Sequence, residues 1–162
     1  MSDASRPEAG FPAPGGPPAP DDVTALDRLA AAGDVTVRAG GHDLLVMVDE
    51  VGSAERLTPE AVAALLPRVR LVLADFAAVR ERAAAFLWEW GAQGEETEEE
   101  RARFHRVMVP TTLTVTGAAQ FAVHFEARPT EHAADAPYLL DGYWPAVHLD
   151  AELLPDRVTI EA

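Results

Sequence analysis

The sequence predicts an α+β fold: an antiparallel sheet with a long and a short helix packed on one face, preceded by a disordered proline-rich tail. Two observations lead to this prediction. Segments in which apolar and polar residues alternate lie on both sides of a long segment with helical periodicity. Hydrophobic residues make up 48% of the 162 residues, which is enough for one domain with a core.

The tail is predicted from its composition. Residues 1–21 contain six prolines and three glycines, and Phe11 is their only large apolar residue. Such a segment buries too little apolar surface to offset its chain entropy, so we expect it to be disordered. The single domain then covers residues 22–162.

The domain is expected to begin with a short helix that stops at Gly33, followed by a β-hairpin. In DVTVRAGGHDLLVMVDEV, residues 34–51, the alternation changes phase at a Gly-Gly pair. This pattern predicts strands at Val35–Arg38 and Asp43–Glu50 joined by a turn at Gly40 and Gly41.

A long helix should follow, from Thr58 as the cap and Pro59 in the first turn to about Trp90, with a kink at Pro67. One apolar stripe runs along it, formed by Val69, Val72, Phe76, Val79, Ala83, Phe86 and Trp90. The stripe could be the seam of a homodimer, but strands on both sides favour packing against a sheet. Trp88 lies off the stripe and is either exposed or covered by a neighbouring helix.

The C-terminal half is predicted as a short helix and four strands. Thr97 and Glu100 have the spacing of a capping box, which places the helix at Glu98–Val107. Two strands follow around a turn at Thr116 and Gly117, with apolar residues at every second position. The segments 147–149 and 158–161 alternate in the same way and complete the sheet.

Composition limits the compartment and the partner. The chain contains no cysteine and no stretch of about 18 apolar residues, and its first ten residues lack the features of a signal peptide. We therefore expect a cytoplasmic protein that does not enter a membrane. The net charge of −14 opposes binding to nucleic acid and favours a basic protein partner. All 13 basic residues are arginine and asparagine is absent, which indicates a GC-rich, bacterial genome.

No catalytic motif is present. The sequence lacks GxGxxG, GxxxxGK[ST], GxSxG and HExxH, and two of its three serines lie in the tail. Ser53, the third, has no base near it in sequence. We therefore expect no enzymatic activity and no cofactor.

The alternative function is that of a metal-binding module or a metal-dependent enzyme. His124 and Glu126, and likewise His148 and Asp150, are two residues apart on predicted strands and so share a face. If those strands are neighbours, two imidazoles and two carboxylates meet, a ligand set that suits a divalent transition metal. The same four residues could instead belong to the solvated face of a half-buried sheet and bind no metal.

A binding surface is predicted near the C-terminus. Aromatic and acidic residues gather there, and aromatics with one polar end are favoured at interfaces. The candidate residues are Tyr138, Asp141, Tyr143, Trp144 and Asp150. Five acids against one arginine within residues 141–161 make a basic partner the natural one.

Residues 34–162 resemble a family of small bacterial domains of unknown function. The resemblance rests on the order of elements and on segments such as TEEERARFHRVMV, TTLTVT and QFAVHFEA, followed by an aromatic segment and a final hairpin. Members commonly carry aromatic-Gly-His in the segment where this chain has Tyr143-Trp144-Pro145-Ala146, which lacks the glycine and the histidine. The resemblance implies an immunity-like, toxin-neutralising protein and supplies no catalytic residue.

Overall fold

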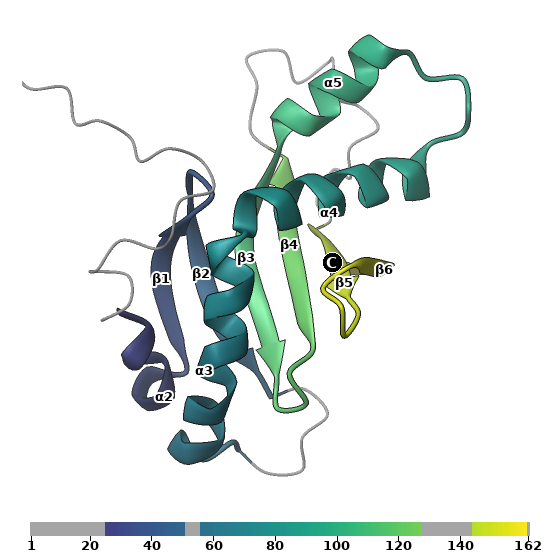
Figure 1. The fold of residues 1–162 in the computed structure, drawn as a ribbon. Coiled ribbons are helices and arrows are strands. Elements are labelled where there is room, and N and C mark those ends of the chain that lie inside the picture. Colours follow the sequence, from purple (N-terminus) through teal and green to yellow (C-terminus); the bar gives the residue numbers. More distant parts are fainter. Residues whose placement is uncertain (1–24, 51–55, 128–143, 162) are drawn as a thin grey trace, which may run out of the picture.

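The computed structural model describes residues 25–50, 56–127 and 144–161. Within these ranges the chain is a mixed α+β fold with a six-stranded sheet and four helices (Figure 1). The strands lie side by side in sequence order, from β1 at one edge to β6 at the other. The proline-rich tail predicted for residues 1–21 lies outside the described residues.

The N-terminal elements form as predicted. Helix α2, Leu29–Ala32, ends at Gly33, whose left-handed backbone (φ +82°) directs its N–H to the carbonyl of Leu29. Strands β1, Asp34–Ala39, and β2, His42–Asp49, pair antiparallel around Gly40 and Gly41. Both turn glycines have positive φ, as a tight two-residue hairpin turn requires.

The predicted long helix is two helices. Helix α3, Pro59–Ala74, begins at Thr58, whose side chain accepts a hydrogen bond from the N–H of Ala61. It continues through Pro67, where a kink was predicted, and the break falls at Asp75 (φ −114°, ψ 26°). Helix α4, Phe76–Gly91, then runs in a new direction across the sheet (Figure 1).

The exposure of the residues around Pro67 and the burial of Phe76 explain why the helix breaks at Asp75 and not at Pro67. Pro67 and Ala63, the residue whose carbonyl the proline leaves without a helical donor, have exposed side chains on the outer side of α3, so the lost bond faces water. At Asp75 the change of direction instead allows the next residue, Phe76, to be buried in the core at 1% exposure.

Helix α5, Glu98–Val107, has the predicted bounds and the predicted capping box. The Thr97 side chain accepts from the N–H of Glu100, and the Glu100 carboxylate accepts from the N–H of Thr97 at 2.7 Å. Arg80 on α4 secures the end of this helix, because its guanidinium donates to the backbone carbonyls of His105 and Met108.

The remaining strands complete the sheet. They are β3 (Met108–Thr116), β4 (Phe121–Ala127), β5 (Trp144–Leu149) and β6 (Pro155–Glu161). All neighbouring pairs are antiparallel except β2 and β3, which are parallel. The prediction of a wholly antiparallel sheet was therefore wrong. Helices α3, α4 and α5 separate β2 from β3 and return the chain to the end of the sheet at which β2 began, so β3 runs in the same direction as β2.

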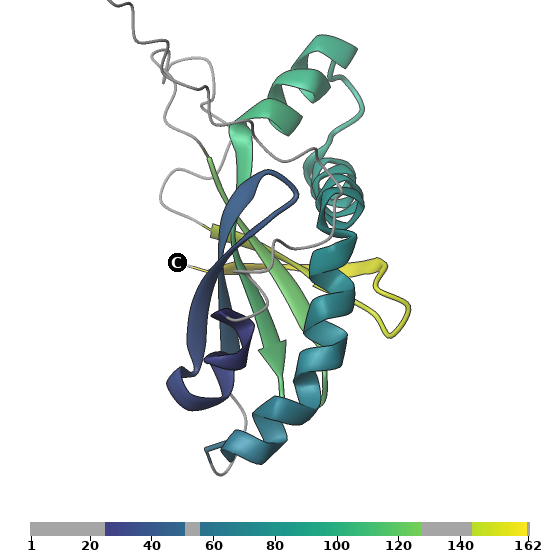
Figure 2. The same cartoon turned by 60° about the vertical axis from the view of Figure 1, so that its left-hand side comes forward.

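The helices of the described residues lie on one face of the sheet (Figure 2). Five residues of the predicted stripe are buried there at 1% exposure or less, namely Val69, Val72, Phe76, Val79 and Ala83, so this part packs on the sheet as predicted and is not available as a homodimer seam. The prediction was wrong at the C-terminal end of the stripe, where Phe86 is only partly buried and Trp90 is 54% exposed. Trp88 lies 5.3 Å from the ring of Phe104, so helix α5 covers it. No helix in the described part of the chain is long and apolar enough to cross a membrane.

Gly40 provides a test of this packing. A Cβ added to it would lie 3.0 Å from the backbone nitrogen of Ala77 and 3.1 Å from the ring of Phe76, whereas nothing lies within 4 Å of one added to Gly41. Both glycines have positive φ, which costs a substituted alanine roughly 1–2 kcal/mol. We expect Gly40→Ala to lower the free energy of unfolding by roughly 1–3 kcal/mol more, through overpacking.

Chemical denaturation of the two variants measures the difference. Gly41→Ala is the matched control, since it carries the conformational cost without the steric one. Equal destabilisation of the two variants would contradict the described contact between the hairpin turn and α4.

Candidate functional site

The face of the sheet opposite the helices carries the candidate site. Side chains alternate along each strand, so the residues out of phase with the core lie on this face. We call it the open face, since no helix of the described residues covers it (Figure 2). On strands β3 to β6 it consists of Thr112, Thr114, Thr116, Ala122, His124, Glu126, Trp144, Ala146, His148, Arg157, Thr159 and Glu161.

His148 on β5 is held by two residues of β6. Its Nε2 lies 2.8 Å from Oγ1 of Thr159, and its Nδ1 lies 3.3 Å from Nη2 of Arg157. Arginine can only donate, so Nδ1 accepts and Nε2–H donates to the threonine hydroxyl. Partial burial, with Arg157 next in importance, lowers the pKa of His148, and this ring is therefore a neutral imidazole with a defined tautomer.

His124 on β4 is held in a similar way by a residue of the adjacent strand β3 and a residue of β6, the strand beyond β5. Its Nε2 lies 3.1 Å from Oγ1 of Thr114 on β3, and its Nδ1 lies 3.6 Å from Oε2 of Glu161 on β6. Burial lowers the pKa of His124, against the opposing effects of the carboxylates of Glu161 and Asp49. The residue thus links three strands across the open face.

The two histidines lie diagonally across the β4–β5 pair, because Ala122 is opposite His148 and His124 is opposite Ala146. The two alanines are buried, at 5% and 0% exposure, although they lie on the open face. Small side chains here leave room for the imidazoles and threonines around them to meet. The centre of the open face is therefore an ordered polar layer one side chain thick.

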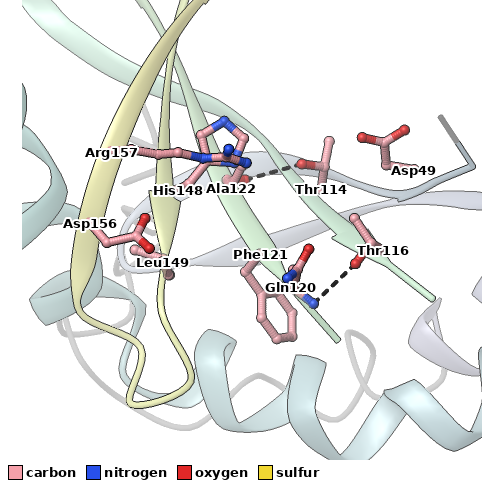
Figure 3. A pocket seen from close by; sticks show the side chains of 10 residues that line it. All are labelled: Asp49, Thr114, Thr116, Gln120, Phe121, Ala122, His148, Leu149, Asp156 and Arg157. Atoms are coloured by element: carbon pink, nitrogen blue, oxygen red, sulfur yellow. Dashed lines mark hydrogen bonds between the residues drawn. The ribbon is translucent and has the colours of Figure 1, made fainter. Parts of the chain in front are cut away.

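A depression with a volume of about 490 Å³ lies beside this layer (Figure 3). His148, Arg157 and Asp156 line it on the side of β5 and β6. Asp49, Thr114 and Thr116 line it on the side of β2 and β3. Its lining is mainly polar and carries both signs of charge, so it suits polar groups of a partner better than an apolar ligand.

Trp144 marks the opposite end of β5. Its side chain is 51% exposed, and it lies opposite Glu161 in the pairing of β5 with β6. Since Ala146 and His148 occupy the open face, alternation places the indole there as well. The open face thus has an exposed aromatic ring beside a carboxylate at one end and a polar depression at the other.

The other residues of the predicted binding surface have different outcomes. Tyr138, Asp141 and Tyr143 lie outside the described residues. Asp150 is in the turn between β5 and β6, where its carboxylate accepts hydrogen bonds from the N–H groups of Glu152 and Leu154, both at 2.9 Å. Its carboxylate has a local structural role in that turn.

The predicted metal ligands are only partly brought together. His124 and His148 share a face on neighbouring strands, as predicted. Glu126 lies one further step along β4, away from His148, and the carboxylate of Asp150 is bonded within its turn. Across the described ranges, no three His, Asp or Glu side chains are grouped so that they could hold a metal ion.

Four residues that organise the open face were not singled out from the sequence: Thr114, Arg157, Thr159 and Glu161. The alternation in residues 157–161 places three of them on one face. Their proximity to His124 and His148 depends on strand order and register, which local patterns do not specify.

Comparisons of the chain with protein-family models, with curated proteins and with solved structures found no match.

The burial of His124 predicts a pH dependence of stability. Because the folded state lowers its pKa below the ordinary value of 6.5, the folded protein binds fewer protons than the unfolded chain. The resulting stabilisation is complete above about pH 6.5 and is lost as the pH falls toward the lowered pKa. We expect His124→Gln, which cannot be protonated, to make the free energy of unfolding vary less between about pH 7 and pH 5.

Urea denaturation across that pH range is the measurement. His148→Gln is a comparison variant, since its ring is also neutral and partly buried. A pH dependence that is unchanged in His124→Gln would contradict the burial of this imidazole.

Proposed function

We propose that the protein is a cytoplasmic, non-enzymatic interaction module that binds a basic protein partner through the open face, with Trp144 as the central contact. One observation carries the proposal: the sheet has helices on one face, while the other displays an exposed tryptophan beside an ordered polar layer. Exposed tryptophans at such positions are enriched among the residues that dominate binding energy.

The charge of the chain supports a basic partner. The formal net charge is −14, and Glu126 and Glu161 lie on the same face as Trp144. A lysine or arginine of a partner that stacks on the indole would lie close to the carboxylate of Glu161, so a cation–π contact and an ion pair would form together. Such a surface also speeds the encounter with a positively charged protein.

We propose toxin neutralisation as the particular form of this activity. Proteins that act on nucleic acid carry clustered lysine and arginine. An acidic protein that covers such a cluster blocks access to the phosphate backbone. The resemblance of residues 34–162 to immunity-like domains agrees with this proposal. The proposal concerns the kind of partner that the protein binds and assigns no reaction to the chain itself.

Trp144→Ala tests the proposal. We expect it to weaken binding of the partner by about tenfold or more, as truncation of a central aromatic residue does. Affinity capture of the tagged, full-length protein from host lysate at low salt identifies the partner, and calorimetry with that purified partner gives the dissociation constant. We also expect the affinity to fall as salt rises, because the two surfaces are oppositely charged.

Trp90→Ala is the matched control. Trp90 is 54% exposed, close to the 51% of Trp144, but it lies at the end of α4 in the helical layer. A partner that binds both variants as tightly as the unaltered protein, or one whose binding depends on Trp90 alone, would rule out the open face as the binding surface.

A further inference from the structure

Strand β6 is an edge strand of the sheet that the described residues form. Among the described strands its one neighbour is β5. Asp156, Arg157, Ile160 and Glu161 on it are exposed. The backbone groups of an edge strand that point away from the sheet can pair with another strand, and soluble proteins usually protect such edges.

Ile160 makes this edge distinctive. Its side chain is 37% exposed, and it lies on the same face as Val158, which is half-buried at the margin of the core. A flexible charged residue at that position would repel an approaching strand, whereas isoleucine favours one. Along β6 the apolar residues Val158 and Ile160 alternate with Arg157, Thr159 and Glu161, which are charged or polar.

We propose that β6 pairs antiparallel with β6 of a second copy of this chain, around a two-fold axis at Thr159. This inference goes beyond the proposed function and does not depend on it. Such a contact is isologous, since the same strand contributes both halves, and it closes at two copies. The two sheets would join into one continuous sheet with both open faces on the same side.

The register at Thr159 is complementary in both charge and polarity. It places Arg157 opposite Glu161 of the second copy, and this pair occurs twice because of the symmetry. On the other face it places Val158 opposite Ile160 of the second copy, again twice. Thr159 lies opposite its own counterpart, a favoured cross-strand pair.

Neighbouring registers lack this complementarity. An axis at Val158 would place Asp156 opposite Ile160, which combines a carboxylate with an apolar side chain. A shift of one residue in the pairing would place residues from opposite faces of β6 against each other, which an antiparallel ladder does not allow. An axis at Arg157 would place two guanidinium groups against each other.

The contacts within one chain leave these side chains able to pair. Arg157 uses one of its five N–H donors on Nδ1 of His148, at 3.3 Å, so its other donors remain for a carboxylate. Glu161 approaches His124 through Oε2, at 3.6 Å, and has a second oxygen. The ion pair between copies would extend the polar layer of the open face from one copy into the next.

Charge exchange between two variants tests this pairing. Arg157→Glu and Glu161→Arg each convert both ion pairs into like-charge pairs, and we expect each to weaken self-association by about tenfold. When the two variants are mixed, each glutamate again faces an arginine, so the mixed dimer should recover the affinity of the unaltered protein. One strand makes a small interface, so sedimentation velocity should cover about 1 to 300 µM.

Two matched controls make the same charge changes away from β6. They are Arg103→Glu on the exposed surface of α5 and Glu95→Arg in the loop before it. Both should self-associate as the unaltered protein does, and circular dichroism confirms that every variant is folded. Because the readout is mass without any partner added, failure here and failure of the proposed function are separate results.

Recovery of the dimer on mixing, with weak association of each variant alone, is the result that the proposal predicts. An unaltered protein that stays monomeric throughout the series would overturn it. So would variants that associate as strongly as the unaltered chain, or a mixture no stronger than its components.

Discussion

The arrangement of this protein depends on how apolar surface is distributed between the two faces of one sheet. Helices α3 and α4 bury the stripe from Val69 to Ala83 against one face, together with Phe121, Val123 and Phe125 of β4. A half-buried sheet needs polar residues on its other face, and strands β3 to β6 supply mostly polar ones there, although register shifts interrupt the alternation at Pro110–Thr112 and at His148–Leu149. The location of the candidate surface is therefore a consequence of how the core is packed.

The open face is more ordered than a merely solvated face would be. His124 and His148 each contact side chains from neighbouring strands, and Ala122 and Ala146 are buried between them. Side chains fixed in this way lose little conformational entropy when a partner binds, which favours affinity. The lowered pKa of each histidine keeps this layer neutral, so the charge of the face comes from its carboxylates and arginines.

Local signals predicted most of the elements, and long-range pairing accounts for the differences. The Gly40–Gly41 turn, the caps at Thr58 and Thr97 and the bounds of α5 follow from residues close in sequence. The break at Asp75 instead of a kink at Pro67 depends on where Phe76 meets the sheet, and the parallel pairing of β2 with β3 depends on the path of three helices. Similarly, periodicity placed His124 and His148 on one face, but only the register of β4 with β5 brings them together beside Arg157 and Glu161.

The central claim is that a partner binds the open face and leaves the helical layer exposed. The two most exposed tryptophans of the described residues test it directly, because Trp144 and Trp90 have similar exposure and lie in different layers. Hydroxyl-radical footprinting of the protein with and without its captured partner measures the oxidation of each indole. We expect the partner to protect Trp144 and to leave the oxidation of Trp90 unchanged. Protection of Trp90 with continued oxidation of Trp144 would contradict the account.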